Sequence, residues 1–140
     1  MRVVVFVKAT AESEAGVMAE PELFEAMGKY NQALIEAGVM KGGDGLKPSK
    51  HARRVQFDGP RRSVTDGPFA ETHELVAGYW LWEVKDMDDA VEWVKRCPNP
   101  MHGKSEIEIR PVFEMEDFAD AMTDEVAALH NANKAAFEAR

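Results

Sequence analysis

The sequence predicts one α+β domain in which an antiparallel sheet carries helices on one of its faces. Segments typical of strands and helices follow in the order strand, helix, hairpin region, strand, helix, strand, with a further helix at the end. This is the order of a split βαβ arrangement. The length of 140 residues, with a hydrophobic content of 45%, suits a single domain that can bury a core.

The N-terminal part is expected to form a strand, a loop and a helix. The run from Arg2 to Lys8 is β-branched and aromatic, which is typical of a strand. The polar residues 9–20 suit a mobile loop. Pro21 opens a helix that glycine ends at Gly38, because proline tolerates the first helical position and glycine commonly follows the last one. Apolar side chains recur along it at helical spacing, namely Leu23, Met27, Tyr30 and Leu34.

The next part is expected to be a glycine-rich break followed by a hairpin. The segment MKGGDGLKPSK, residues 40–50, contains three glycines, which are expected to break regular structure. Residues 51–69 indicate a hairpin turned at Asp58-Gly59. Its apolar residues alternate with polar ones, so we expect only one face of the hairpin to be buried.

The strand over residues 75–84 is expected to lie in the centre of the sheet, because it is apolar on both faces. Trp80 and Trp82 point to one side, whereas Tyr79 and Leu81 point to the other. The first strand is also apolar on both faces, so something must cover the second face, and a second copy of the chain is the economical answer. The three aromatic residues are expected in this core, with a pocket for an aromatic ligand as the alternative.

The C-terminal part is expected to form a helix, a strand and a helical tail. Asp86 can cap a helix that Cys97-Pro98 stops, and the strand 106–113 follows after a loop. Residues 117–140 are alanine-rich with apolar residues three or four apart, which predicts an amphipathic helix broken near Thr123.

Composition argues against several kinds of partner and location. Seventeen basic and twenty-five acidic residues give a net charge of -8, which repels nucleic acid and anionic membranes. The exception is a local basic group that is expected to be a solvated edge: Lys47, Lys50, Arg53, Arg54, Arg61 and Arg62. The apolar opening is too short for a secretory signal or a membrane span. The single cysteine, Cys97, excludes an intrachain disulfide and fits a reducing cytoplasm.

No metal or other cofactor is expected. No histidine pair has the i, i+4 spacing of a helical zinc site, and the acidic residues form no calcium loop. The segment KGGDGLKP lacks the order that a phosphate-binding loop requires. Cys97 follows a helix end, where nothing activates a thiol, so it is not expected to be a nucleophile.

Several separated motifs resemble one protein family in the expected order. They are VTDGPFAETHE, GYWLWEV, DDAVEWVKRCP and HGKSEIEIRPV. The chain resembles the DGPFAETKE family, a branch of the YCII-related proteins, from Met1 to about Glu114. The resemblance implies a ferredoxin-like fold that pairs two sheets into a dimeric α+β barrel. It implies a domain over residues 1–115, which leaves residues 116–140 as a helical extension.

The resemblance also bears on function. The wider YCII-related group is assigned a histidine and aspartate active site with the histidine on the first helix, but residues 21–38 contain no histidine. His73 stands where the AETKE motif has lysine. Proteins of this kind are often encoded near alternative sigma factors, which implies a regulatory role as one alternative.

Four residues are the candidates for chemistry. Asp66 is expected either to hold the turn at Gly67-Pro68 or to act as a carboxylate at a barrel mouth. His102 lies in a glycine-flanked loop where its side chain can face a cleft, or it is a surface imidazole. Glu71 can pair with Asp66 as acid and base if the loop folds back, and otherwise it is solvated. His73 precedes the central strand and can approach Asp66.

Two functional hypotheses follow from these candidates. The first is a small cytoplasmic enzyme or ligand-binding protein whose barrel pocket accepts a small molecule, with an aromatic one as an option, and in which Asp66 and His102 handle protons. The second is a non-catalytic regulatory or protein-binding module. If the first holds, Asp66 and His102 are expected to meet in one cavity. A filled barrel with an exposed apolar patch favours the second.

Overall fold

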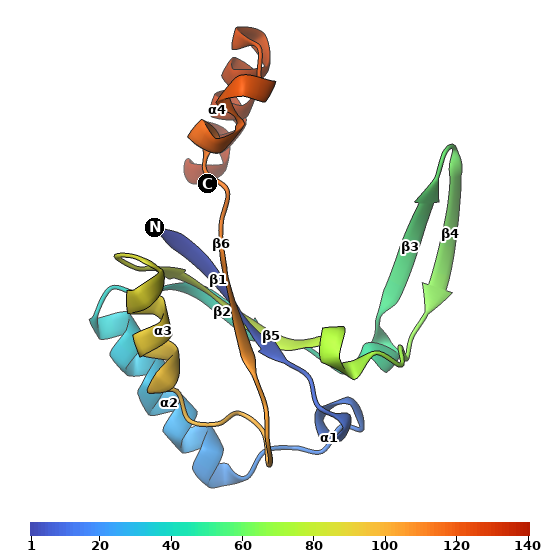
Figure 1. Cartoon of the computed structure of the whole chain (residues 1–140), viewed down its shortest axis with the longest axis vertical. Helices are drawn as coiled ribbons and strands as arrows, with labels where there is room; N and C mark the ends of the chain where they lie inside the picture. Colours follow the sequence, from blue (N-terminus) through green and yellow to red (C-terminus); the bar gives the residue numbers. More distant parts are fainter.

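A four-stranded antiparallel sheet forms the centre of the computed structural model, which describes all residues 1–140 (Figure 1). The strands lie in the order β2-β5-β1-β6. Their bounds are β1 (Arg2–Lys8), β2 (Met40–Gly45), β5 (Val76–Glu83) and β6 (Ile107–Pro111). The helices α2 (Pro21–Glu36) and α3 (Met87–Lys95) cover one face. The predicted α+β class and the central position of β5 are therefore confirmed.

The core lies between this sheet and the two helices. Val3 and Val5 of β1 and Trp82 of β5 are fully buried on the covered face, together with Leu34 of α2. Tyr30 of α2 adds a polar tie, because its hydroxyl donates a hydrogen bond of 2.6 Å to the Trp93 carbonyl oxygen. Burial of apolar side chains is the main favourable term in folding, so this layer holds α2 and α3 on the sheet.

The opposite face of the sheet carries no helix. Its apolar side chains are half-buried in the single chain: Val4, Phe6, Tyr79 and Leu81. Alternation along β1 and β5 places them there, because successive side chains of a strand point to opposite faces. The helices α2 and α3 thus account for the apolar side chains on one face of the sheet, and nothing in the single chain covers those on the other face.

Residues 40–45 of the glycine-rich segment form strand β2, so the predicted break was wrong for these residues, whereas residues 46–50 lie outside the strands. Gly43 pairs with Trp80 of β5. A Cβ atom on Gly43 would lie 2.8 Å from Cδ1 of Trp80 and 2.8 Å from the Tyr79 carbonyl oxygen. Glycine is therefore needed for this close approach to the large indole, a role that glycine takes in strands.

A separate hairpin, β3 (Arg53–Asp58) and β4 (Arg61–Asp66), projects from the body (Figure 1). The chain turns at Gly59, whose φ of 58° favours glycine. The hairpin was predicted correctly, but the expected burial of one face was wrong. Phe57 is 71% exposed and every residue of both strands is exposed, because the hairpin projects from the body and only its base, where Arg54 lies over the Phe69 ring, contacts other residues.

A short helix, α1 (Ala11–Glu14), interrupts the stretch that was expected to be a loop. Thr10 and Ser13 form a capping box, in which the Thr10 hydroxyl accepts from the Ser13 N–H at 3.2 Å and the Ser13 hydroxyl accepts from the Thr10 N–H at 2.9 Å. This reciprocal pair satisfies backbone donors at the helix start. It fixes the direction in which the α1 side chains point.

The tail consists of the 3-10 segment η3 (Met115–Ala121) and helix α4 (Asp124–Glu138). The Thr123 hydroxyl accepts from the Val126 N–H at 3.2 Å and caps α4, so the predicted break near Thr123 is confirmed. α4 extends away from the sheet (Figure 1) and buries no residue. None of the helices combines the length and apolar content that a membrane crossing needs.

Candidate functional site

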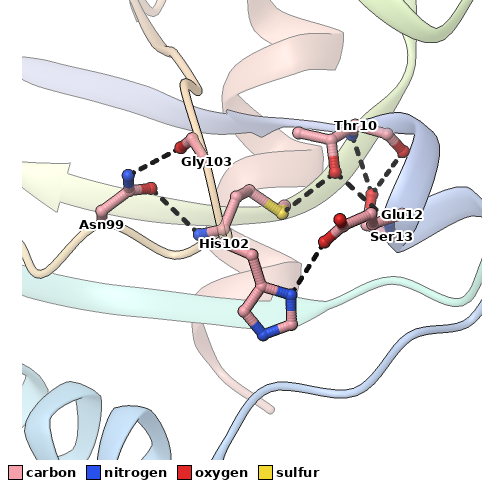
Figure 2. A network of polar contacts seen from close by, with 7 residues as sticks. Thr10, Glu12, Ser13, Asn99, His102 and Gly103 are labelled. Atoms are coloured by element: carbon pink, nitrogen blue, oxygen red, sulfur yellow. Dashed lines mark hydrogen bonds and ion pairs between the residues drawn. The ribbon is translucent and has the colours of Figure 1, made fainter.

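The structure pairs His102 with a carboxylate that the sequence did not suggest. Nδ1 of His102 lies 2.8 Å from Oε2 of Glu12 on α1 (Figure 2). The His102 side chain is 39% exposed, so solvent or a ligand reaches the ring. The contact joins residues ninety positions apart in sequence. It brings α1 against the loop that precedes β6.

Hydrogen bonds within that loop hold the backbone around His102. The Asn99 side chain accepts from the Met101 N–H at 3.0 Å and donates to the Gly103 carbonyl oxygen at 2.8 Å (Figure 2). The Ser105 hydroxyl donates to the same Asn99 side chain at 2.6 Å. An asparagine side chain that bonds its own loop in this way fixes the turn. Asn99 therefore holds the backbone of both sequence neighbours of His102.

A second contact ties the loop to the start of α1. The Thr10 hydroxyl lies 3.6 Å from the Met101 sulfur, towards which it donates (Figure 2). Because Thr10 also caps α1, the residue that orients Glu12 contacts the neighbour of His102. The two halves of the pair are thus positioned by the same small network.

This arrangement can move a proton at one defined atom. The Glu12 carboxylate occupies Nδ1 of His102, and Nε2 makes no hydrogen bond with the chain. A carboxylate at one ring nitrogen favours a proton there and leaves the other nitrogen to accept or donate one. Nε2 of His102 is therefore the ring nitrogen that is free to contact a ligand.

A pocket lies beside the Pro100-Met101 segment that precedes His102. Its volume is about 410 Å³, and Met27, Met40 and Trp80 line it with Met101. Asn31 supplies a polar group, whose side-chain oxygen accepts a hydrogen bond of 2.9 Å from the Trp80 indole N–H. A much smaller hollow of about 20 Å³ contains Glu12 and His102 and shares Pro100 and Met101 with the pocket. The pair and the pocket are therefore immediate neighbours.

The DGPF turn is clamped to the 3-10 turn η1 (Ser49–His51). The Gly67 N–H donates to the Ala52 carbonyl oxygen at 2.9 Å, and the Phe69 N–H donates to the Ser49 hydroxyl at 3.0 Å. Ser49 is 6% exposed. A Cβ atom on Gly67 would overlap the Ser49 carbonyl oxygen. The motif therefore has a packing role that only glycine can fill at this position.

Glu14 of α1 completes this clamp. Its carboxylate accepts from the Ser49 N–H at 2.9 Å and also from the Ser49 hydroxyl. Hydrogen bonds to a charged acceptor are stronger than those between neutral groups. The short helix α1 is thus joined to two parts of the chain. Glu12 contacts the His102 loop, and Glu14 contacts Ser49 beneath the DGPF turn.

The other predicted site residues lie in separate contacts. Asp66 is 76% exposed and pairs with Arg53 across the hairpin, at 3.1 Å from Oδ1 to Nε. Glu71 lies 4.0 Å from Nη1 of Arg54. No hydrogen bond or ion pair joins Asp66 to His102 or to Glu71 within the chain. The expected contact between Asp66 and His102 is absent, because each binds a partner from a different element.

His73 belongs to the 3-10 turn η2 (Thr72–Glu74), directly before β5. It lines a cavity of about 520 Å³ together with Lys8 and Lys104. Asp66 does not line this cavity. His73 is therefore placed with basic side chains instead of with the carboxylate that the sequence suggested.

The part of the chain that forms the sheet and the site also matches a known protein family. The YCII-related domain family matches residues 1–116. The chain belongs to this family. α4 lies beyond the matched residues.

The YCII-related chain is also similar to an uncharacterised protein of Rhizobium meliloti, with 30% identity over 78 residues. The match covers 56% of this chain and spans about 63% of the length of that relative.

Two further ionisable side chains of this YCII-related protein lie under α3. Burial raises the pKa of the Cys97 thiol to about 11. Burial also raises the pKa of the Tyr30 hydroxyl. Both groups are neutral at physiological pH, so neither supplies a ready nucleophile or base. No group of three or more His, Cys, Asp and Glu side chains converges in a way that could hold a metal ion.

Proposed function

We propose that this protein binds a small, mostly apolar molecule in the pocket beside Met101 and exchanges a proton with it at His102. The observation that carries the proposal is the 2.8 Å contact between Nδ1 of His102 and Glu12, next to a pocket of about 410 Å³. Small-molecule sites are commonly concave, apolar and supplied with a few polar groups, and their volumes are about 300–1,000 Å³.

The lining of the pocket favours an aromatic ligand. Methionine side chains adapt to the shape of an aromatic ring, and their sulfur atoms make favourable contacts with it. Three methionines line the pocket, namely Met27, Met40 and Met101. Trp80 offers an aromatic edge, and Asn31 offers an amide that fixes the orientation of a polar substituent. This supports the aromatic ligand class that the sequence suggested.

Within this proposal Glu12, and not Asp66, is the carboxylate partner of His102. Asp66 and Glu71 act in the hairpin and at its base, where each pairs with an arginine. Both carboxylates are more than half exposed, so these pairs orient the hairpin without contributing much stability. The proton-handling role falls to the one imidazole that a carboxylate already holds.

We also infer that two copies pair through the uncovered face of the sheet, in the cytoplasm. Half-buried Val4, Phe6, Tyr79 and Leu81 supply an apolar face that a second copy would bury. A non-catalytic, protein-binding role is the second candidate, and the exposed Phe57 and Phe137, at 71% and 74%, favour it. A regulatory role near sigma factors would use such surfaces.

Ligand binding can be followed by the fluorescence of Trp80, which lines the pocket. We expect a panel of small phenols and aromatic acids to contain at least one compound that quenches the wild-type protein and loses this effect in Trp80→Phe. His102→Gln and Glu12→Gln are expected to weaken the binding of ionisable compounds by about tenfold, as loss of a charged hydrogen bond would. His130→Gln, on exposed α4, is the matched control. Equal affinities in all three variants would contradict the proposal.

A further inference from the structure

A basic cavity lies at the end of the sheet, apart from the pocket beside Met101. Its volume is about 520 Å³, and it is lined by Lys8 at the end of β1, His73 of η2 and Lys104 in the loop before β6. The Lys8 N–H donates to the Glu106 carbonyl oxygen at 3.1 Å, which brings the last of these segments beside β1. Three segments far apart in sequence thus meet around one space.

The cations of this cavity have no partner within the chain. The lysine and arginine ion pairs of the chain are formed by other residues, and neither Lys8 nor Lys104 takes part in one. The chain has twenty-five acidic and seventeen basic residues and is therefore negative overall. Unpaired lysines that share a cavity make this region an exception to the overall charge. Glu106 is the single carboxylate in the lining, which leaves an excess of positive charge.

Hydroxyl groups complete the lining. Thr10, Thr72 and Ser105 belong to it, and the Thr72 hydroxyl makes no hydrogen bond within the chain. Ammonium, imidazole and hydroxyl groups are donors that recognise oxyanions, and charged donors make the stronger hydrogen bonds. Cavities of this volume fit a small molecule, and a net charge of -8 disfavours a nucleic acid.

We propose that this cavity binds the anionic group, carboxylate or phosphate, of a small metabolite between Lys8 and Lys104, with His73 and Thr72 as further donors. Glu106 faces the same space and accepts a hydrogen bond from a hydroxyl or amine on the ligand. This contact adds to the binding of the anionic group and is not required for it. The site gives His73 a binding role that does not depend on His102.

The test uses the whole chain with inorganic phosphate and acetate as probes, at constant ionic strength set with chloride. Titration is followed by the amide signals of Ala9, Thr72, His73, Lys104 and Ser105 in NMR spectra. We expect saturable shifts at these amides with one of the two anions. Shifts with phosphate alone assign a phosphate ligand, and shifts with acetate alone assign a carboxylate.

Two lysine variants and a matched control give the second measurement. Lys8→Gln and Lys104→Gln are each expected to weaken binding of the active anion by about tenfold. Lys85→Gln removes the same charge at an exposed position outside the cavity and is expected to leave binding unchanged. If Lys85→Gln weakens binding as much, or if neither anion shifts these amides in the wild-type protein, the proposal is wrong.

Discussion

Gly67 lies against the carbonyl oxygen of Ser49 so closely that no side chain fits between them. This relationship gives the DGPF motif a structural explanation. The turn docks on a buried serine, which Glu14 of α1 holds from the other side. The base of the projecting hairpin is thereby fixed to the body of the protein.

Gly67→Ala is expected to destabilise the protein by about 1–3 kcal/mol or more, as overpacking does, because its Cβ would displace Ser49. Gly28→Ala is the matched control, because a Cβ there meets nothing within 4 Å inside α2. That change is expected to stabilise the helix by about 0.5–1 kcal/mol. Urea unfolding measures both. A Gly67→Ala protein as stable as the wild type would show that the clamp gives way freely.

The ion pair between Arg2 and Glu114 is expected to make stability depend on pH. The guanidinium donates to both carboxylate oxygens, at 3.1 and 3.0 Å, and these bonds lower the pKa of Glu114. Because the folded-state pKa is below the unfolded one, the stabilisation is complete above the ordinary value of about 4.3 and is lost as the pH falls through the folded-state value.

Comparison of the wild type with Glu114→Gln measures this effect. The pair is partly exposed, so we expect a small difference in the urea midpoint at pH 7. The difference is expected to shrink steadily under increasingly acidic conditions. A difference that persists unchanged in acid would show that the glutamate acts through packing and not through its charge.

Cys97 is expected to react slowly in the folded protein. Burial raises its pKa to about 11, compared with about 8.5 for a free cysteine. At pH 8 the thiolate fraction is then more than about 100-fold lower, and the thiolate is the reactive form. Ellman's reagent measures the rate in the folded and the urea-unfolded chain. Equal rates in the two states would rule out protection by burial.

We expect the protein to be a homodimer to which the tail contributes. Light scattering at micromolar concentration should give about twice the chain mass of 15.6 kDa. α4 buries nothing in the single chain, so removal of residues 117–140 is expected to weaken the dimer and leave the folding of the remaining domain intact. A monomeric full-length protein would contradict the pairing of sheets. A truncated chain with unchanged dimer affinity would make the tail an accessory.

The order of elements could be predicted from the sequence because each main element carries a local signal. Runs of β-branched and aromatic residues, apolar on both faces, identified β1 and β5, and Pro21 and Asp86 marked the starts of α2 and α3. The glycine-rich β2 could not be predicted in this way. Its glycines have low strand propensity, and the requirement for them lies in the contact of Gly43 with Trp80, which is a tertiary relationship.

The candidate site was only partly predictable for the same reason. His102 could be singled out from its loop, but its partner Glu12 lies ninety positions away in a helix of four residues. The spacing of Thr10 and Ser13 is a capping signal that could have located this helix. Nothing in the local sequence indicates that Ser49 is buried, because its burial comes from the turn that docks on it.

The pairing of His102 with Glu12 is tested most directly by the ring nitrogen signals of His102 in NMR spectra. We expect a protonated Nδ1 in the wild type, and a clear change of both ring nitrogen signals in Glu12→Gln. Asp66→Asn should leave them as they are, because Asp66 pairs with Arg53. Signals that respond to Asp66→Asn and ignore Glu12→Gln would contradict the assignment of Glu12 as the group that positions His102.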